Sequence, residues 1–176
     1  TDEPAKIVLR NWFVILSNLY PGAILSYRSA LEVRPIEGHI YLTYKYNKNV
    51  ILPGLIIHLL KGTAMDIGTV PFFEHLHRSS EARVFLENMQ QVRSSAKFSK
   101  VLAQEILERK LEAIIGTRGE DQLNNIRDEA RVIAPALNMQ KECQRLEKLI
   151  GAILSTRPEG ILNSEIAKAR AYGEPF

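Results

Sequence analysis

The sequence predicts an α+β fold in which a small antiparallel sheet with flanking helices precedes a region built from helices alone. Residues 39–47, HIYLTYKYN, alternate between apolar and polar side chains, which is the period of a half-buried strand. From residue 70 onward, apolar residues recur every three or four positions, as they do in amphipathic helices. We therefore expect an α+β module over residues 1–69 and a helical region over residues 70–176.

Length and composition indicate a folded protein without a membrane span. The chain has 176 residues, of which 45% are hydrophobic and 24% are charged, as in ordinary globular domains. The apolar run at residues 50–60 is interrupted by Pro53 and Gly54, and it falls short of the roughly 18 residues that a span requires. The single cysteine, Cys143, excludes an internal disulfide and suits a reducing compartment, so we expect a cytoplasmic protein.

The N-terminal module is expected to begin with two helices. Residues 4–19 carry apolar side chains around more than half of a helical circumference, which predicts a deeply packed helix that ends before Pro21. Residues 24–32, ILSYRSALE, predict a short second helix with Ser26 as its N-cap and with Ala30 and Leu31 turned inward.

The strands are expected to follow directly. After the strand at 39–47, Asn47 to Asn49 suggest a tight turn, and residues 50–62 supply one or two further strands. Pro53 cannot donate a backbone hydrogen bond, which indicates an edge strand or a bulge at that point.

The second half is expected to consist of helices over residues 70–78, 79–93, 99–116, 120–137, 138–155 and 163–173. Ser79 or Ser80 is the expected cap of the second of these helices, and Pro135 is expected to end or kink the fourth. Asn138 is the expected N-cap of the fifth. The stripe expected to face inward from residues 99–116 contains Leu102, Ile106, Leu111 and Ile114.

The charge distribution permits contact with nucleic acid but does not demand it. The formal charge of +3 is uneven, because residues 1–100 hold 12 Lys or Arg against 8 Asp or Glu, whereas residues 101–176 hold 11 against 12. Lys45 and Lys48 lie among tyrosines in a stretch without acidic residues, a composition that suits phosphates and stacked bases. The same residues also protect edge strands from aggregation, so both interpretations stay open. Arg28 is the third candidate for contact with a nucleic-acid backbone.

A second candidate surface lies on the helix expected at residues 120–137. Arg127 and Arg131 share one face of this helix with Asn124. Such a face either forms salt bridges with glutamates of the next helix or anchors a neighbouring domain, and the sequence leaves both alternatives open.

The sequence predicts no catalytic residue, no metal site and no cofactor. His75 and His77 are two positions apart on an expected helix, where they point away from each other and cannot share a metal ion. Cys143 falls on the apolar stripe of its expected helix, which is typical of a core residue rather than a nucleophile. There is no glycine-rich phosphate loop and no nucleophile elbow, so we do not expect an enzyme.

Several short blocks, taken in order, resemble known bacterial families. The blocks YPGAILSYRSALE, GHIYLTYKYN and LPGLIIHLLKG are similar to the core of the AbiEi-type antitoxin domain of abortive-infection systems. The later blocks ARVFLENMQQVR, LNNIRDEARVIAPALNM, LIGAILST and AKARAYGEPF resemble the region between that domain and the catalytic domain in a set of bacterial Fic-family proteins.

The resemblance implies a regulatory rather than a catalytic role for this chain. Fic enzymes transfer AMP from ATP to a hydroxyl with a loop of the type H-P-F-x-x-G-N-G-R, and none of the four histidines here begins such a loop. The expected function is therefore a non-catalytic, antitoxin-like region that docks a Fic catalytic domain in the same polypeptide. Duplex DNA and a second copy of the chain are the other expected partners. The alternative is a protein-interaction or oligomerisation scaffold that does not bind DNA.

The resemblance also implies one inhibitory motif. Many Fic proteins carry a helix with the pattern [S/T]-x-x-x-E-[G/N], whose glutamate pairs with an arginine of the ATP site. Ser155, Glu159 and Gly160 fit that pattern here. Pro158, directly before the glutamate, opposes a continuous helix, so a turn that ends the preceding helix is the competing interpretation.

Overall fold

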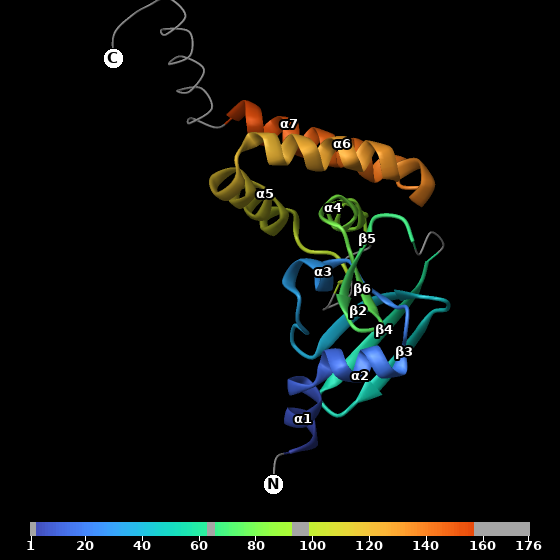
Figure 1. Cartoon of the computed structure of the whole chain (residues 1–176). Coiled ribbons are helices and arrows are strands. Elements are labelled where there is room, and N and C mark those ends of the chain that lie inside the picture. Colours follow the sequence, from blue (N-terminus) through green and yellow to red (C-terminus); the bar gives the residue numbers. More distant parts are fainter. Residues whose placement is uncertain (1–2, 63–65, 93–98, 157–176) are drawn as a thin grey trace, which may run out of the picture.

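A six-stranded sheet and a layer of helices make up the part of the chain that the computed structural model describes, namely residues 3–62, 66–92 and 99–156 (Figure 1). Within these residues, the elements in chain order are α1 (Pro4–Arg10), α2 (Trp12–Leu19), β1 (Ile24–Leu25), α3 (Arg28–Glu32), β2 (His39–Tyr44), β3 (Lys48–Leu52), β4 (Leu55–Lys61), β5 (Thr69–Phe73), β6 (Leu76–Ser79), α4 (Glu81–Asn88), α5 (Gln104–Arg118), α6 (Glu120–Leu137) and α7 (Gln140–Thr156). The α+β fold class predicted from the sequence is confirmed. None of the described helices is long and apolar enough to cross a membrane.

The sheet is mixed rather than antiparallel, with the strand order β3-β4-β2-β1-β6-β5. After β2 the chain passes to the edge as β3 and returns through the Pro53-Gly54 turn as β4, which inserts between β3 and β2. This path makes β4 parallel to β2, and β6 is likewise parallel to β1, while the remaining pairs are antiparallel. The expected tight turn extends to Asn49, but β3 already begins at Lys48, so the last two residues of the expected turn belong to a strand. Pro53 lies in the turn outside both strands, so of the edge strand or bulge expected there, only the preceding strand β3 is at an edge.

The sheet continues ten residues beyond the expected change of structure. Residues 70–78, predicted to be helical, instead form β5, a turn at Glu74 with φ of 45°, and β6. Backbone hydrogen bonds to another strand outweigh the helical period of this stretch. β6 pairs with the free edge of β1, where Leu25 lies opposite Arg78. The purely helical part therefore starts after Ser79, not at residue 70.

The first expected helix is divided in two. Its break lies at Asn11, whose backbone N–H and side-chain Nδ2 both donate to the carbonyl of Ile7 and so end α1. None of the residues of α1 is buried, so the prediction of a deeply packed helix is wrong for its first half. It holds for α2, which buries Trp12 and Leu16.

Ser26 does not cap a helix, contrary to expectation. It is fully buried at the end of β1, where its Oγ accepts a hydrogen bond of 2.9 Å from Thr43 Oγ1 on β2. The helix α3 starts two residues later, after Tyr27, which holds the rare backbone angles φ 53° and ψ −139°. Tyr41 of β2 lies beyond the end of β1 and has no partner residue on that strand. Its backbone N–H donates instead to Ser29 Oγ at 2.8 Å. Ala30 is turned inward, as predicted.

The buried apolar side chains form two separate cores, one beneath the sheet and one among the later helices. The first lies between the sheet and α2, and its largest buried members are Leu16, Leu25, Ile40, Leu42, Leu55, Ile57, Leu59 and Leu76. The second lies among α4, α5, α6 and α7, and includes Phe85, Leu86, Leu107, Leu111, Leu123, Ile126, Leu146 and Ile150. The layer of later helices reaches the sheet through α4, which contacts β6, and through α3, which contacts both β2 and α4 (Figure 1).

The stripe expected to face inward from residues 99–116 is confirmed in part. Leu102 and Leu111 are buried as predicted, but the other buried residues of α5 are Leu107 and Ile115, and Ile114 packs against the core only partly buried. Ile106 is 38% exposed. The helix begins at Gln104, five residues later than expected, which changes the position from which the inward face is counted.

The helix termini follow ordinary capping chemistry with one correction. Ser80 caps α4 through its side chain, which accepts from the backbone N–H of Arg83, as predicted. Pro135 lies in the last turn of α6 and does not interrupt it. Asn138 ends α6 in the left-handed conformation, with φ of 55°, rather than opening α7 as its N-cap. The helix expected at 163–173 lies outside the described residues.

Candidate functional site

Arg28, expected to reach a nucleic-acid backbone, is held inside the fold. Its backbone N–H donates to the carbonyl of Lys100 at 2.9 Å, and its guanidinium donates to Glu32 at 3.3 Å and to the carbonyl of Ser99 at 3.5 Å. The side chain is only 20% exposed. These contacts connect α3 to the segment that leads into α5, and contact of Arg28 with a nucleic-acid backbone stays a prediction.

Lys45 and Lys48 lie at a different place from Arg28. Lys45 follows β2, with its Nζ 5.6 Å from the centre of the Tyr44 ring, and Lys48 begins the edge strand β3. Tyr44 also contacts the rings of Tyr20 and Tyr46, at centroid distances of 5.5 and 5.4 Å. The structure therefore brings two lysines and three tyrosines together at one corner of the sheet, which we call the tyrosine corner, but it does not bring Arg28 there.

Arg127 and Arg131 lie on α6, as expected, and both contact other side chains. Arg127 donates to Asn124 Oδ1 at 2.7 Å on its own helix. Arg131 forms ion pairs with Glu147 of α7 and, at 3.4 Å, with Asp128. These contacts match the salt-bridged face that the sequence offered as one of two alternatives.

Of the three residues in the inhibitory pattern, the structure describes only Ser155. It is exposed in the last turn of α7, where its Oγ donates to the carbonyl of Ala152 at 3.1 Å. Glu159 and Gly160 lie outside the described residues, so the pattern stays a prediction.

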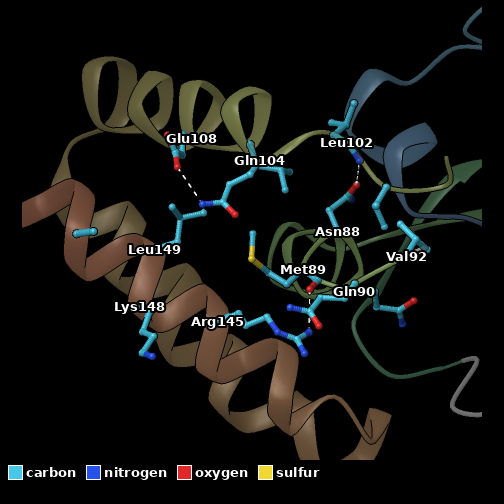
Figure 2. A pocket seen from close by; sticks show the side chains of 14 residues that line it. Asn88, Met89, Gln90, Val92, Leu102, Gln104, Glu108, Arg145, Lys148 and Leu149 are labelled. Atoms are coloured by element: carbon cyan, nitrogen blue, oxygen red, sulfur yellow. Dashed lines mark hydrogen bonds between the residues drawn. The ribbon is translucent and has the colours of Figure 1, made fainter. Parts of the chain in front are cut away.

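A cavity of about 620 Å³ opens between the end of α4, the start of α5 and the last turns of α7 (Figure 2). We call it the helical groove. Its lining residues are Asn88, Met89, Gln90, Gln91, Val92, Val101, Leu102, Gln104, Leu107, Glu108, Arg145, Lys148, Leu149 and Ala152. Three separate helices thus contribute side chains to one concave surface.

The frame of the helical groove is fixed by hydrogen bonds. Arg145 Nη1 donates to the carbonyl of Met89 at 3.0 Å, which ties α7 to the end of α4. Asn88 Oδ1 accepts the backbone N–H of Leu102 at 3.0 Å, which ties the start of α5 to the same end. Figure 2 shows Met89 directed into the space between α5 and α7, with Leu149 on the other side. The groove therefore has an apolar floor within a rigid polar frame.

A second, smaller cavity of about 200 Å³ lies between the sheet and the helices. Beside it, Glu87 of α4 is 1% exposed and accepts three hydrogen bonds: from the Tyr27 N–H at 3.0 Å, from Ser79 Oγ at 2.8 Å and from Arg83 Nε at 3.2 Å. Arg83, itself 3% exposed, also donates to the carbonyl of Ile67 at 2.6 Å. This junction network connects α3, β6, α4 and the segment before β5.

The electrostatics of the junction network follow from burial. Burial raises the pKa of the Glu87 carboxyl, while the Arg83 guanidinium and the hydrogen bonds from Tyr27 and Ser79 act in the opposite direction. Burial, together with the nearby carboxylate of Glu87, raises the pKa of the Tyr27 phenol to about 12. The carboxylate oxygens of Glu87 accept hydrogen bonds and its charge is paired with Arg83 within the protein, so the network joins the layers rather than presenting a reactive group.

No cluster of three His, Cys, Asp or Glu side chains among the described residues is placed to hold a metal ion. Cys143 is buried on α7, as expected, and burial raises the pKa of its thiol, which disfavours the nucleophilic thiolate.

Sequence reasoning missed three features of this molecule. The Arg83–Glu87 pair has the i, i+4 spacing of a surface salt bridge, and the local sequence of α4 gives no signal that the pair is buried. The helical groove combines three helices whose packing no local pattern encodes. The contact between His39 and His58 depends on the parallel register of β2 and β4, which the sequence does not reveal.

The three features in this part of the protein that bear on function are therefore the helical groove, the tyrosine corner and the junction network. Comparisons with models of protein families, with curated proteins and with solved structures give no match for the chain, so its family is assigned by none of them.

Proposed function

We propose that this chain is a non-catalytic regulatory region of a Fic-type AMP transferase and that its helical groove docks the transferase domain. The observation that carries the proposal is the groove itself: about 620 Å³, an apolar floor at Met89 and Leu149, and a frame fixed by hydrogen bonds. The Fic assignment of the docked domain rests on the sequence resemblance.

The shape and chemistry of the groove suit a protein segment. Partly buried apolar side chains form its floor, and Arg145, Lys148 and Glu108 add charges at its lining. An amphipathic helix binds such a surface through its apolar face, while polar contacts at the rim set its direction. Apolar anchors in a central pocket carry most of the binding energy in interfaces of this kind.

The path of the chain also favours docking in the same polypeptide. Ala152 lines the groove, and Thr156, the last described residue of α7, lies one turn further along the helix. A transferase domain joined to the chain beyond α7 is tethered within a short linker of the groove, which gives it a high effective concentration at this surface.

The test replaces an apolar residue of the floor by a charged one. The Leu149→Glu variant should weaken binding of the transferase domain encoded in the same reading frame by at least about tenfold, because a carboxylate is desolvated on contact. Isothermal titration calorimetry of the separately purified domain measures the affinity. Suppression of AMP transfer by added chain provides a second readout, and it should weaken in parallel.

The matched control is Val132→Glu, which introduces the same charge on α6 at a side chain that is 77% exposed and does not line the groove. This variant should bind as the wild type does. Equal binding by both variants, with unchanged melting temperatures, contradicts docking in the groove. A reading frame without an H-P-F-x-x-G-N-G-R block contradicts the Fic assignment independently of the groove.

A second candidate function, contact with duplex DNA, is favoured by the tyrosine corner. It combines Lys45 and Lys48 with the exposed ring of Tyr46 and the partly buried ring of Tyr20, while Tyr44, which contacts both rings, is buried. Lysines beside accessible aromatic rings are typical of surfaces that hold a nucleic-acid backbone. Binding should be weak and should decrease steeply between about 50 and 200 mM salt. Fluorescence anisotropy should show loss of binding in Lys45→Ala/Lys48→Ala, and no loss in the control Lys110→Ala/Lys141→Ala. Absence of binding by the wild type at low salt would rule out this candidate.

A further inference from the structure

Two histidines from parallel neighbouring strands meet on the sheet face opposite α2. Nδ1 of His39 on β2 lies 2.9 Å from Nε2 of His58 on β4, and both side chains are partly buried. In the register of the two strands, His58 lies beside Tyr41, so the two imidazoles are diagonal neighbours. The distance is that of a hydrogen bond between ring nitrogens.

The orientation of the rings shows that the two nitrogens point at each other. The ring planes are inclined by only 13°, and the ring centres are 5.2 Å apart. Ring atoms lie about 1.2 Å from the centre of an imidazole, so the two nitrogens lie close to the line that joins the centres. The rings therefore meet edge to edge. An N–H of one ring aimed along this line at the lone pair of the other forms a linear N–H···N bond, whereas the lone pairs of metal ligands must converge on a third point.

The neighbouring side chains determine where the protons lie. His58 Nδ1 is 3.2 Å from Asn49 Oδ1 on β3, and an amide oxygen only accepts, so His58 carries a proton on Nδ1. In the neutral ring its Nε2 is then an acceptor, which leaves Nδ1 of His39 as the donor. Asn49, His58 and His39 form a chain of hydrogen bonds across three strands.

Tyr41 of β2, Arg28 of α3 and Glu37 of the turn before β2 are further titratable or charged groups near the pair. Tyr41 of β2 stacks on the face of His58, with centroids 4.5 Å apart and planes inclined by 11°. Arg28 of α3 lies close enough to lower the pKa of the Tyr41 phenol, against the larger effect of burial, which raises it. Glu37 precedes the pair in the turn before β2 and is exposed. Burial and the charge of His39 both lower the pKa of His58.

We infer that His39 and His58 share one proton in an N–H···N bond and form an acid-sensitive latch between β2 and the β3–β4 hairpin. The pair accepts a first additional proton without losing the bond, because either ring can then donate to the other. A second additional proton places N–H groups on both facing nitrogens, and the two cations repel each other. Acid therefore opens the contact on this face of the sheet.

The sign of the pH effect follows from the lowered pKa of His58. The folded state binds protons at lower pH than the unfolded chain, so acidification favours opening. Protection of the β3 and β4 amides against hydrogen exchange, corrected for the intrinsic exchange rate, should decrease between pH 7 and pH 5. Each unit by which the pKa is lowered corresponds to about a tenfold loss.

Nuclear magnetic resonance of the ¹⁵N-labelled protein tests the bond directly. At pH 8 we expect scalar coupling between His39 Nδ1 and His58 Nε2 across the hydrogen bond, and the Nδ1–H tautomer of His58. On acidification the two rings should titrate in two separate steps. Absence of the coupling, together with independent titration of both rings near the ordinary value, overturns the inference.

Two variants separate the latch from general acid sensitivity. His39→Gln keeps an N–H donor for His58 but cannot titrate, so the pH dependence of hydrogen exchange in β3 and β4 should decrease or vanish. His75→Gln, in the exposed turn before β6, should retain the pH dependence of the wild type. The same pH dependence in all three proteins contradicts the latch, and the coupling measurement on the wild type decides the question if His39→Gln does not fold.

Discussion

Glu37 and Gly38 are the central residues of the two-residue turn that leads into β2, and both have positive φ, 50° and 78°. Ile36 and His39 exchange both backbone hydrogen bonds across the turn, at 3.0 and 2.9 Å. Gly38 is required here, since a Cβ atom would lie 2.8 Å from the carbonyl oxygen of Gly54. Glu37 is exposed, and its Cβ makes the left-handed conformation unfavourable for it.

Replacing Glu37 by asparagine should therefore stabilise the protein. Asn-Gly is the preferred pair for a turn with two positive φ angles, and the gain should be about 0.5–1 kcal/mol. Urea unfolding at pH 8 measures it. Gly38→Ala is the opposing control and should destabilise. A loss of stability in Glu37→Asn would contradict the turn geometry.

At the scale of elements, the start of α5 lacks a side-chain cap. Ala103 has the extended backbone angles of an N-cap, φ −59° and ψ 147°, but it offers no oxygen to the first turn. Ile106 in that turn donates its backbone N–H to the carbonyl of Ala103 at 3.0 Å, but no side chain caps the turn.

Ala103→Ser should stabilise α5 and the whole protein by about 1 kcal/mol, because the hydroxyl accepts one of the backbone N–H groups of this turn. The control Ala113→Ser, at an exposed position in the middle of the same helix, should instead cost a few tenths of a kcal/mol, roughly the difference in helix propensity. Chemical denaturation compares the two variants. Equal effects of both substitutions would mean that Ala103 is not the cap.

Elements with a strong period and clear ends could be predicted from the sequence, and those defined by distant pairing could not. The period identified β2 and the helices from α4 to α7, and Ser80 marked the start of α4. Residues 70–78 failed because the β1 edge, more than 40 positions away, selects strand over helix. The contacts that Arg28 makes could not be predicted for a related reason: its partners at residues 99–100 are distant in the sequence.

At the scale of the whole molecule, the junction network connects the sheet layer to the helical layer. Each layer has its own apolar core, while Glu87 receives hydrogen bonds from α3 and β6 and pairs with Arg83 in a buried setting. Loss of the carboxylate charge would leave the guanidinium of Arg83 buried with its charge uncompensated.

Glu87→Gln should therefore cost about 3 kcal/mol or more of unfolding free energy. The matched control Glu81→Gln removes the same charge from the exposed pair that Glu81 forms with Arg118, and it should cost less than about 1 kcal/mol. Thermal and chemical unfolding of both variants provide the comparison. Similar small losses in the two variants would show that the junction contributes little.

The parallel pair of β1 and β6 has a consequence for the biosynthesis of the protein. Ile24 pairs with His77, so the central strand β1 lacks one neighbour until more than fifty further residues have been made. A nascent chain that ends before β6 exposes the unpaired edge of β1, and an unpaired edge invites association with other chains. Slow translation through residues 26–76 should therefore favour aggregation or binding by chaperones. Once β6 has been made, it pairs with the free edge of β1 and provides a surface on which α4 can fold.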